Sequence, residues 1–97
     1  VCVAARRRNL LEELAAEITS TGGAAPTIVE IDIMEEGAPQ KLADAARAAL
    51  GHIDILVNSA GGSRPAIPID APEEEWESVM RLNFVRVRQL THAVLPD

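Results

Sequence analysis

Three short aliphatic runs, separated by segments of helix length, constrain most strongly what this chain can fold into. They occupy residues 1–5, 27–33 and 53–58. Parallel strands need a crossover of a dozen or more residues, usually a helix, and strands covered on both faces read as continuous aliphatic runs. The order therefore predicts β-α-β-α-β-α and an α/β doubly wound parallel sheet.

The segments between and after these runs carry apolar residues at helical spacing. Asn9 is suited to cap the first helix, which is expected to end before a pair of glycines. The second helix is expected after Pro39 and to end at Gly51. A long third helix is expected to begin near Asp70, because Glu73 completes a capping-box spacing with it.

Length, charge and cysteine content exclude several classes of protein. The 97 residues allow one domain at most. A net charge of -6 argues against a nucleic-acid partner, which is itself a polyanion. No apolar run approaches the roughly 20 residues that cross a bilayer. The single cysteine, Cys2, permits no internal disulfide, and we expect no metal site and cytoplasmic residence by default.

In doubly wound sheets, ligands bind beyond the carboxyl ends of the strands. The first expected strand is followed by Arg6 and Arg7, with Ala5 at its end. These arginines suit an ordinary solvated turn. At the second strand of a dinucleotide-binding sheet, however, an acid selects a free ribose 2′-hydroxyl and an arginine admits a 2′-phosphate. The position therefore favours NADP over NAD.

Two further groups of residues follow the next expected strands. Asp32 suits a turn, or it can accept a hydrogen bond from an adenine amine while Ile33 packs on the ring. Asn58 also suits a turn, but the small residues up to Gly61 leave space for close approach of a ligand.

Asn83 is the least expected residue of the last helix. It shares a stripe, at steps of three and four, with five apolar residues: Trp76, Met80, Val87, Leu90 and Val94. A buried amide without partners costs about 1–3 kcal/mol. Asn83 therefore either bonds neighbouring backbone, faces solvent on a rotated helix, or holds water or distorts the helix beside an active site.

In this order, the chain resembles the short-chain dehydrogenase/reductase family. The segments VAARR, VEIDI, IDILVNSAG and MRLNF carry the resemblance. They contain Arg6, Asp32, Asn58 and Asn83, each separated from the next by about one crossover. Each motif alone has little specificity, but the ordered set covers the entire chain.

The resemblance implies a Rossmann-type cofactor site for NADP, with NAD less favoured. The cofactor-binding positions fall on Arg6, Arg7, Asp32, Ile33, Asn58, Ala60 and Gly61. Ser59 replaces the second asparagine of the family's Asn-Asn-Ala-Gly motif. Asn83 matches the asparagine of its Asn-Ser-Tyr-Lys catalytic set, which helps to hold a proton-relay water.

The resemblance further implies hydride transfer to or from a small-molecule carbonyl or secondary alcohol, as in a 3-oxoacyl reductase, by a homodimer or homotetramer. Residues 1–97 would form the middle of one dinucleotide-binding domain, lacking the first strand, the glycine-rich loop and the C-terminal half with Ser, Tyr and Lys. The chain contains no tyrosine. The alternative is a noncatalytic dinucleotide-binding or structural relative, which a downstream Tyr-x-x-x-Lys would exclude.

Overall fold

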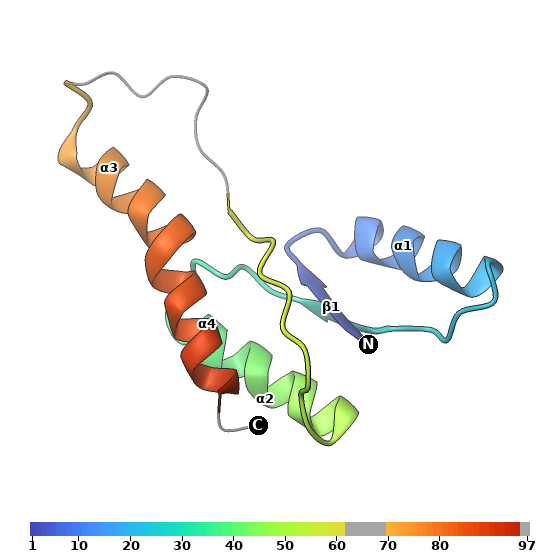
Figure 1. The fold of residues 1–97 in the computed structure, drawn as a ribbon. Helices are drawn as coiled ribbons and strands as arrows, with labels where there is room; N and C mark the ends of the chain where they lie inside the picture. The colour runs from blue at the N-terminus through green and yellow to red at the C-terminus, as the bar shows by residue number, and fades with distance from the viewer. Residues whose placement is uncertain (62–69, 96–97) are drawn as a thin grey trace.

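The computed structural model describes residues 1–61 and 70–95. Its elements, in chain order, are β1 (Cys2–Ala5), α1 (Arg8–Ser20), β2 (Thr27–Glu30), α2 (Ala38–Leu50), α3 (Glu73–Met80), the π-helical turn η1 (Arg81–Val85) and α4 (Arg86–Val94). The last three follow one another without a break and form the long C-terminal helix in Figure 1. Most of the expected proline- and glycine-rich loop, at 62–69, lies outside the described residues.

β1 and β2 form a two-stranded parallel sheet. The strands pair from Cys2 opposite Thr27 to Ala5 opposite Glu30. The backbone N–H of Ile31 then donates to the carbonyl of Ala5 at 2.9 Å, which continues the pairing past the end of β2. Both strands therefore end at the same edge of the sheet, as the α/β class requires.

The third expected strand, at 53–58, is not formed. These residues have no secondary structure, and Ile55 and Val57 are 82% and 77% exposed. In the doubly wound strand order 3-2-1-4, a fourth strand pairs with the first and not with the second or third. β1 and β2 take the second and third places, and no described segment takes the first. The aliphatic run consequently has no strand beside it to pair with.

Helix α1 lies on one side of the two strands, and α2 packed against α4 lies on the other (Figure 1). The core is small and consists largely of short side chains: Leu11, Ala38, Ala43, Ala46 and Leu90 are the buried hydrophobic residues. The alanines of α2 allow close approach of α4, and Arg47 of α2 donates to the carbonyl of Ala93 near the end of α4. None of the helices in the two described ranges is long and apolar enough to cross a membrane.

Two expected helix caps are wrong. Helix α1 begins at Arg8, so Asn9 lies inside it, and Pro72 rather than Asp70 precedes α3 without a side-chain cap. Three glutamates in the first turn of α3 suit the positive end of the helix dipole instead. The expected exit from α2 is confirmed, because Gly51 follows its last residue with a φ of 87° that glycine adopts without strain.

Candidate functional site

Arg6 and Arg7 follow β1 directly and are exposed. The next arginine is committed to its own helix, because Arg8 Nε donates to Glu12 Oε1 at 3.1 Å. Within the described part of the chain, Arg6 and Arg7 form no ion pair with a carboxylate. Two guanidinium groups thus remain available to an anion at the carboxyl edge of the sheet.

Asp32 lies at the same edge, two residues beyond the end of β2, and is half-buried. Its Oδ1 accepts a hydrogen bond from the backbone N–H of Met34 at 2.9 Å, which closes a local turn. The turn role that the sequence left open is therefore present. This bond uses Oδ1 alone. The predicted contact between Asp32 and an adenine is compatible with it, because that contact needs only the other carboxylate oxygen. Ile33 is half-buried beside it.

The segment 58–61 runs along the long C-terminal helix. Asn58 Nδ2 donates to Thr91 Oγ1 at 3.2 Å. A Cβ atom at Gly61 would lie 2.8 Å from Asn83 Oδ1, closer than a side chain tolerates. The three residue steps from 58 to 61 span about 10 Å when extended, and the eight residue steps of helix from Asn83 to Thr91 span about 12 Å. The segment is therefore extended along the helix.

Asn83 occupies the centre of the π-helical turn η1. Its Nδ2 donates to the carbonyl of Val79, four residues earlier, at 2.9 Å. At the end of the turn, the backbone N–H of Arg86 donates to Arg81, five residues earlier, in the wider spacing of a π-helix. Single π-turns inside α-helices are frequent at functional sites. Of the expected roles for Asn83, a bond to neighbouring backbone and a distorted helix are both observed.

The stripe that contains Asn83 is not buried along its whole length, and of the alternatives for Asn83 exposure to solvent is also observed. Asn83 is exposed, and so are Trp76 and Met80, at 37% and 55%. A π-turn inserts one extra residue per turn and rotates everything before it relative to everything after it. Only the part of the stripe after the turn, around Leu90, faces α2 and is buried.

The structure also brings in a residue that the sequence did not single out. Arg86 is the only buried charged residue among those described, at 5% exposure, and it reaches the loop after β2. A signal for it exists in the sequence, because Arg86 lies four residues before the buried Leu90 and therefore on the same helix face.

The described residues contain little else with perturbed chemistry. Burial raises the pKa of the Cys2 thiol. A protonated thiol is a poor nucleophile. No three His, Cys, Asp or Glu side chains within 1–61 and 70–95 are grouped so that they could hold a metal ion.

The described geometry places Arg6 and Asp32 at the carboxyl edge of a parallel α/β sheet. The family model described as "short chain dehydrogenase" matches residues 1–97. The chain belongs to this short-chain dehydrogenase/reductase family. A short chain dehydrogenase of Pseudocercospora fijiensis is 40% identical over an alignment of 99 residues that covers 100% of this chain and 32% of the relative. The chain spans about a third of the length of the curated relatives it matches.

Two solved structures confirm the doubly wound fold class. A 7α-hydroxysteroid dehydrogenase complexed with NADH and 7-oxo glycochenodeoxycholic acid has a TM-score of 0.90 and 33% identity, covering 99% of this chain and 37% of its own. RhlG of Pseudomonas aeruginosa, complexed with NADP, has a TM-score of 0.83 and 30% identity, covering 99% and 37%. The family is one of oxidoreductases that use nicotinamide dinucleotides.

Proposed function

We propose that the protein containing this chain transfers hydride between NADP(H) and a small-molecule carbonyl or secondary alcohol. The observation that carries the cofactor choice is the placement of Arg6. It is exposed at the end of β1, follows Ala5 where an acid would select NAD, and shares the sheet edge with Asp32.

The described residues offer groups suited to the adenosine end of such a cofactor and to the segment along which it would lie. Arg6 and Arg7 supply planar donors for a 2′-phosphate. Asp32, with Ile33 beside it, offers a carboxylate oxygen and an apolar surface to adenine. The small residues of 58–61, Ala60 and Gly61 among them, leave the space along the helix free of bulky side chains.

When bound, the nicotinamide group supplies the hydride that is exchanged with the substrate carbon. The part assigned to Asn83 is to hold a proton-relay water close to the reacting groups. Its side chain is fixed by the bond to Val79 and by the neighbouring backbone of Gly61. The π-turn supports this role, since it sets Asn83 apart from the regular packing of the helix.

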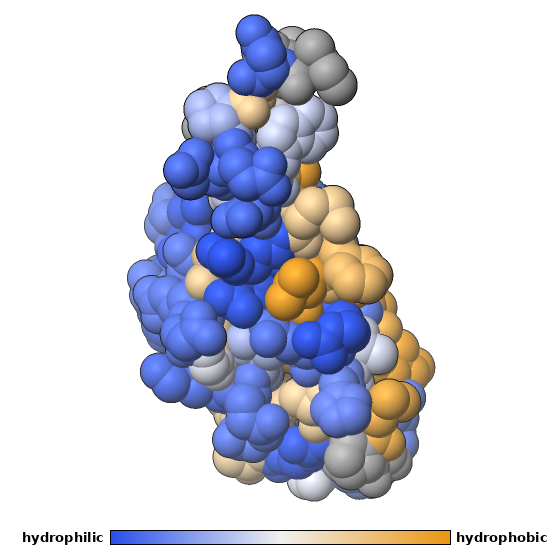
Figure 2. Space-filling model, turned by 90° about the vertical axis from the view of Figure 1, so that its left-hand side faces the viewer, coloured by the Kyte–Doolittle hydropathy of each residue, from blue (hydrophilic) through white to orange (hydrophobic). Residues whose placement is uncertain are grey.

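The long C-terminal helix is also our candidate for the contact between subunits of a homodimer or homotetramer. Met80, Phe84 and Leu95 expose 55%, 59% and 70% of their surface along it. Figure 2 shows apolar residues gathered at one side of the molecule, next to a broad hydrophilic face. Aromatic and methionine side chains of this kind are enriched in protein interfaces.

The proposal is tested by measuring the dissociation constants of NADPH and NADH for the full-length protein and its Arg6→Asp variant. We expect at least tenfold weaker binding of NADPH, equal to about 1.4 kcal/mol, with little change for NADH. Arg88→Asp is the matched control, because it makes the same charge change on the exposed face of α4.

Equal losses for both nucleotides would overturn the assignment to NADP. Binding of NADPH without turnover of any ketone or secondary alcohol would instead indicate the noncatalytic dinucleotide-binding relative.

A further inference from the structure

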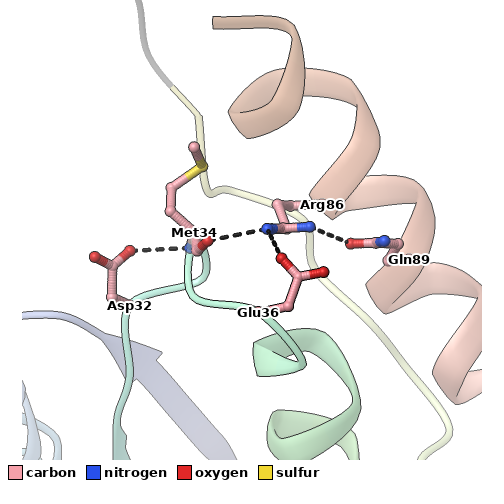
Figure 3. Close-up of polar contacts among 5 residues, drawn as sticks. All are labelled: Asp32, Met34, Glu36, Arg86 and Gln89. Carbon is pink, nitrogen blue, oxygen red and sulfur yellow. Dashed lines mark hydrogen bonds and ion pairs between the residues drawn. The ribbon is translucent and has the colours of Figure 1, made fainter. Parts of the chain in front are cut away.

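Arg86 joins the long C-terminal helix to the loop after β2 (Figure 3). Its Nη2 donates to the carbonyl of Met34 at 3.0 Å, and its Nη1 donates to Gln89 Oε1 at 2.8 Å. The carboxylate of Glu36 lies 3.5 Å from Nη2. A single guanidinium therefore connects two parts of the chain that are about 50 residues apart.

Met34 is held on both sides of its backbone. Its N–H donates to Asp32 Oδ1, and its carbonyl accepts from Arg86. Figure 3 shows these bonds as a continuous path from Asp32 through Met34 to Arg86 and Gln89. The side chain of Asp32 is thus fixed relative to the C-terminal helix by way of one backbone residue.

The hydrogen bond to Met34 contributes more to holding Arg86 against the loop after β2 than the ion pair with Glu36 does. The Glu36 side chain is 96% exposed, so water screens its attraction for Arg86. The hydrogen bond to the Met34 carbonyl is made by a guanidinium that is itself 5% exposed. Such charge-assisted bonds in a dry environment are the strong ones.

Packing alone does not explain an arginine at this position. Burying a charge is costly, and an apolar side chain of similar volume is often no less stable. Within the described residues, Arg86 Nε is buried without an acceptor, which adds to that cost. What an apolar side chain cannot reproduce is the reach of two donors toward Met34 and Gln89.

We infer that Arg86 is a positioning residue for the adenine end of the cofactor. It holds the loop that carries Asp32 and Ile33 against the helix that carries Asn83, without touching the cofactor. The inference rests on the proposed function, because it assigns Asp32 and Ile33 to adenine. Loss of Arg86 should loosen the adenine subsite and leave the reacting end of the site intact.

The experiment compares full-length wild-type protein with Arg86→Met, which keeps the length of the side chain and removes its donors. Calorimetry gives the dissociation constants of NADPH and of adenosine 2′,5′-bisphosphate, which is the adenine half alone. We expect both to rise by the same factor, about tenfold. The kcat at saturating NADPH should stay within about twofold of wild type.

Two controls and one conservative variant sharpen the result. Arg88→Met removes an exposed arginine from the same helix, and Glu36→Gln removes only the screened ion pair; both should leave the two dissociation constants unchanged. Arg86→Lys retains one donor and should give an intermediate loss. If Arg86→Met does not fold, the two dissociation constants of Arg86→Lys test the inference in its place.

Unchanged binding of the bisphosphate to both Arg86 variants would overturn the inference. So would a loss of kcat as large as the loss of affinity, because that indicates a general structural defect. If wild-type protein binds neither NADPH nor NADH, the proposed function itself fails, and the inference fails with it.

Discussion

Gly61 and Asn83 lie so close together that no side chain fits between them: a Cβ atom at Gly61 would stand 2.8 Å from Asn83 Oδ1. Movement of the amide away from Gly61 would disturb the bond that its Nδ2 donates to the carbonyl of Val79. The absence of a side chain at Gly61 is therefore required by the neighbouring helix as well as by any ligand along 58–61.

We expect Gly61→Ala to destabilise the full-length protein by about 1–3 kcal/mol, because it overpacks this contact. Urea unfolding measures the effect, with Ser59→Ala as a control on an exposed neighbour in the same segment. Truncation of the amide should relieve the clash. The double variant Gly61→Ala/Asn83→Ala should thus be more stable than the sum of the two single changes predicts; strict additivity would show that the contact carries no strain.

A second prediction concerns the hydrogen bond from Asn58 to Thr91. Thr91→Val keeps the shape of the side chain and removes its hydroxyl, so we expect a loss of about 0.5–1.5 kcal/mol in the free energy of unfolding. Thr19→Val is a matched control: its hydroxyl also bonds the carbonyl four residues earlier, but contacts no other segment. Equal effects of the two substitutions would remove any stabilising role for Asn58.

The exposed apolar side chains of the C-terminal helix give a third prediction. Phe84→Asp places a charge where we propose that subunits meet, and burying an unpaired charge is unfavourable. Sedimentation of the full-length variant should show a smaller assembly than wild type. Glu77→Lys, a change of charge at an exposed position of α3, should leave the assembly unchanged. If the assembly of both variants is as large as that of wild type, the subunit contact lies elsewhere.

The class of fold follows from the sequence because its signals are local. The strand at 2–5, the crossover helices and the exit at Gly51 each depend on a few consecutive residues, and all are present. The prediction of a strand at 53–58 was wrong because a strand needs a neighbouring strand to pair with, and a hydrophobic run does not show whether one is present. The side chains expected at the sheet edge lie where parallel strands place them, since a shared edge is a consequence of topology.

The periodicity of the sequence could not predict the remainder of the candidate site. A π-turn changes the phase of a helix by one residue, so a stripe read at regular spacing does not stay on one face through it. Regular spacing therefore could not decide whether Asn83 is buried or exposed. The spacing from Leu90 indicates which face of the helix Arg86 lies on, but it does not indicate the partner of Arg86, because that partner is the backbone carbonyl of Met34 and every residue has such a group.

A fourth prediction follows from the raised pKa of Cys2. Because burial favours its neutral thiol, the folded pKa exceeds the unfolded one. The stabilising contribution is fully present below the unfolded pKa and is lost as the pH rises through the folded value. Stability of full-length protein should therefore fall more steeply above about pH 8.5 than that of Cys2→Ser. Identical pH profiles would show that the thiol is not sheltered.

The last prediction concerns residues 1–97 as an isolated polypeptide. Ile55 and Val57 are exposed on a segment without a neighbouring strand, and no large side chain within 1–61 and 70–95 is fully buried. Unpaired strand edges with apolar side chains favour association over folding. We expect broad, noncooperative urea unfolding and aggregation for the isolated segment, whereas the full-length protein unfolds cooperatively. A single sharp transition that is independent of protein concentration would show that α1, α2 and the C-terminal helix stabilise the two-stranded sheet by themselves.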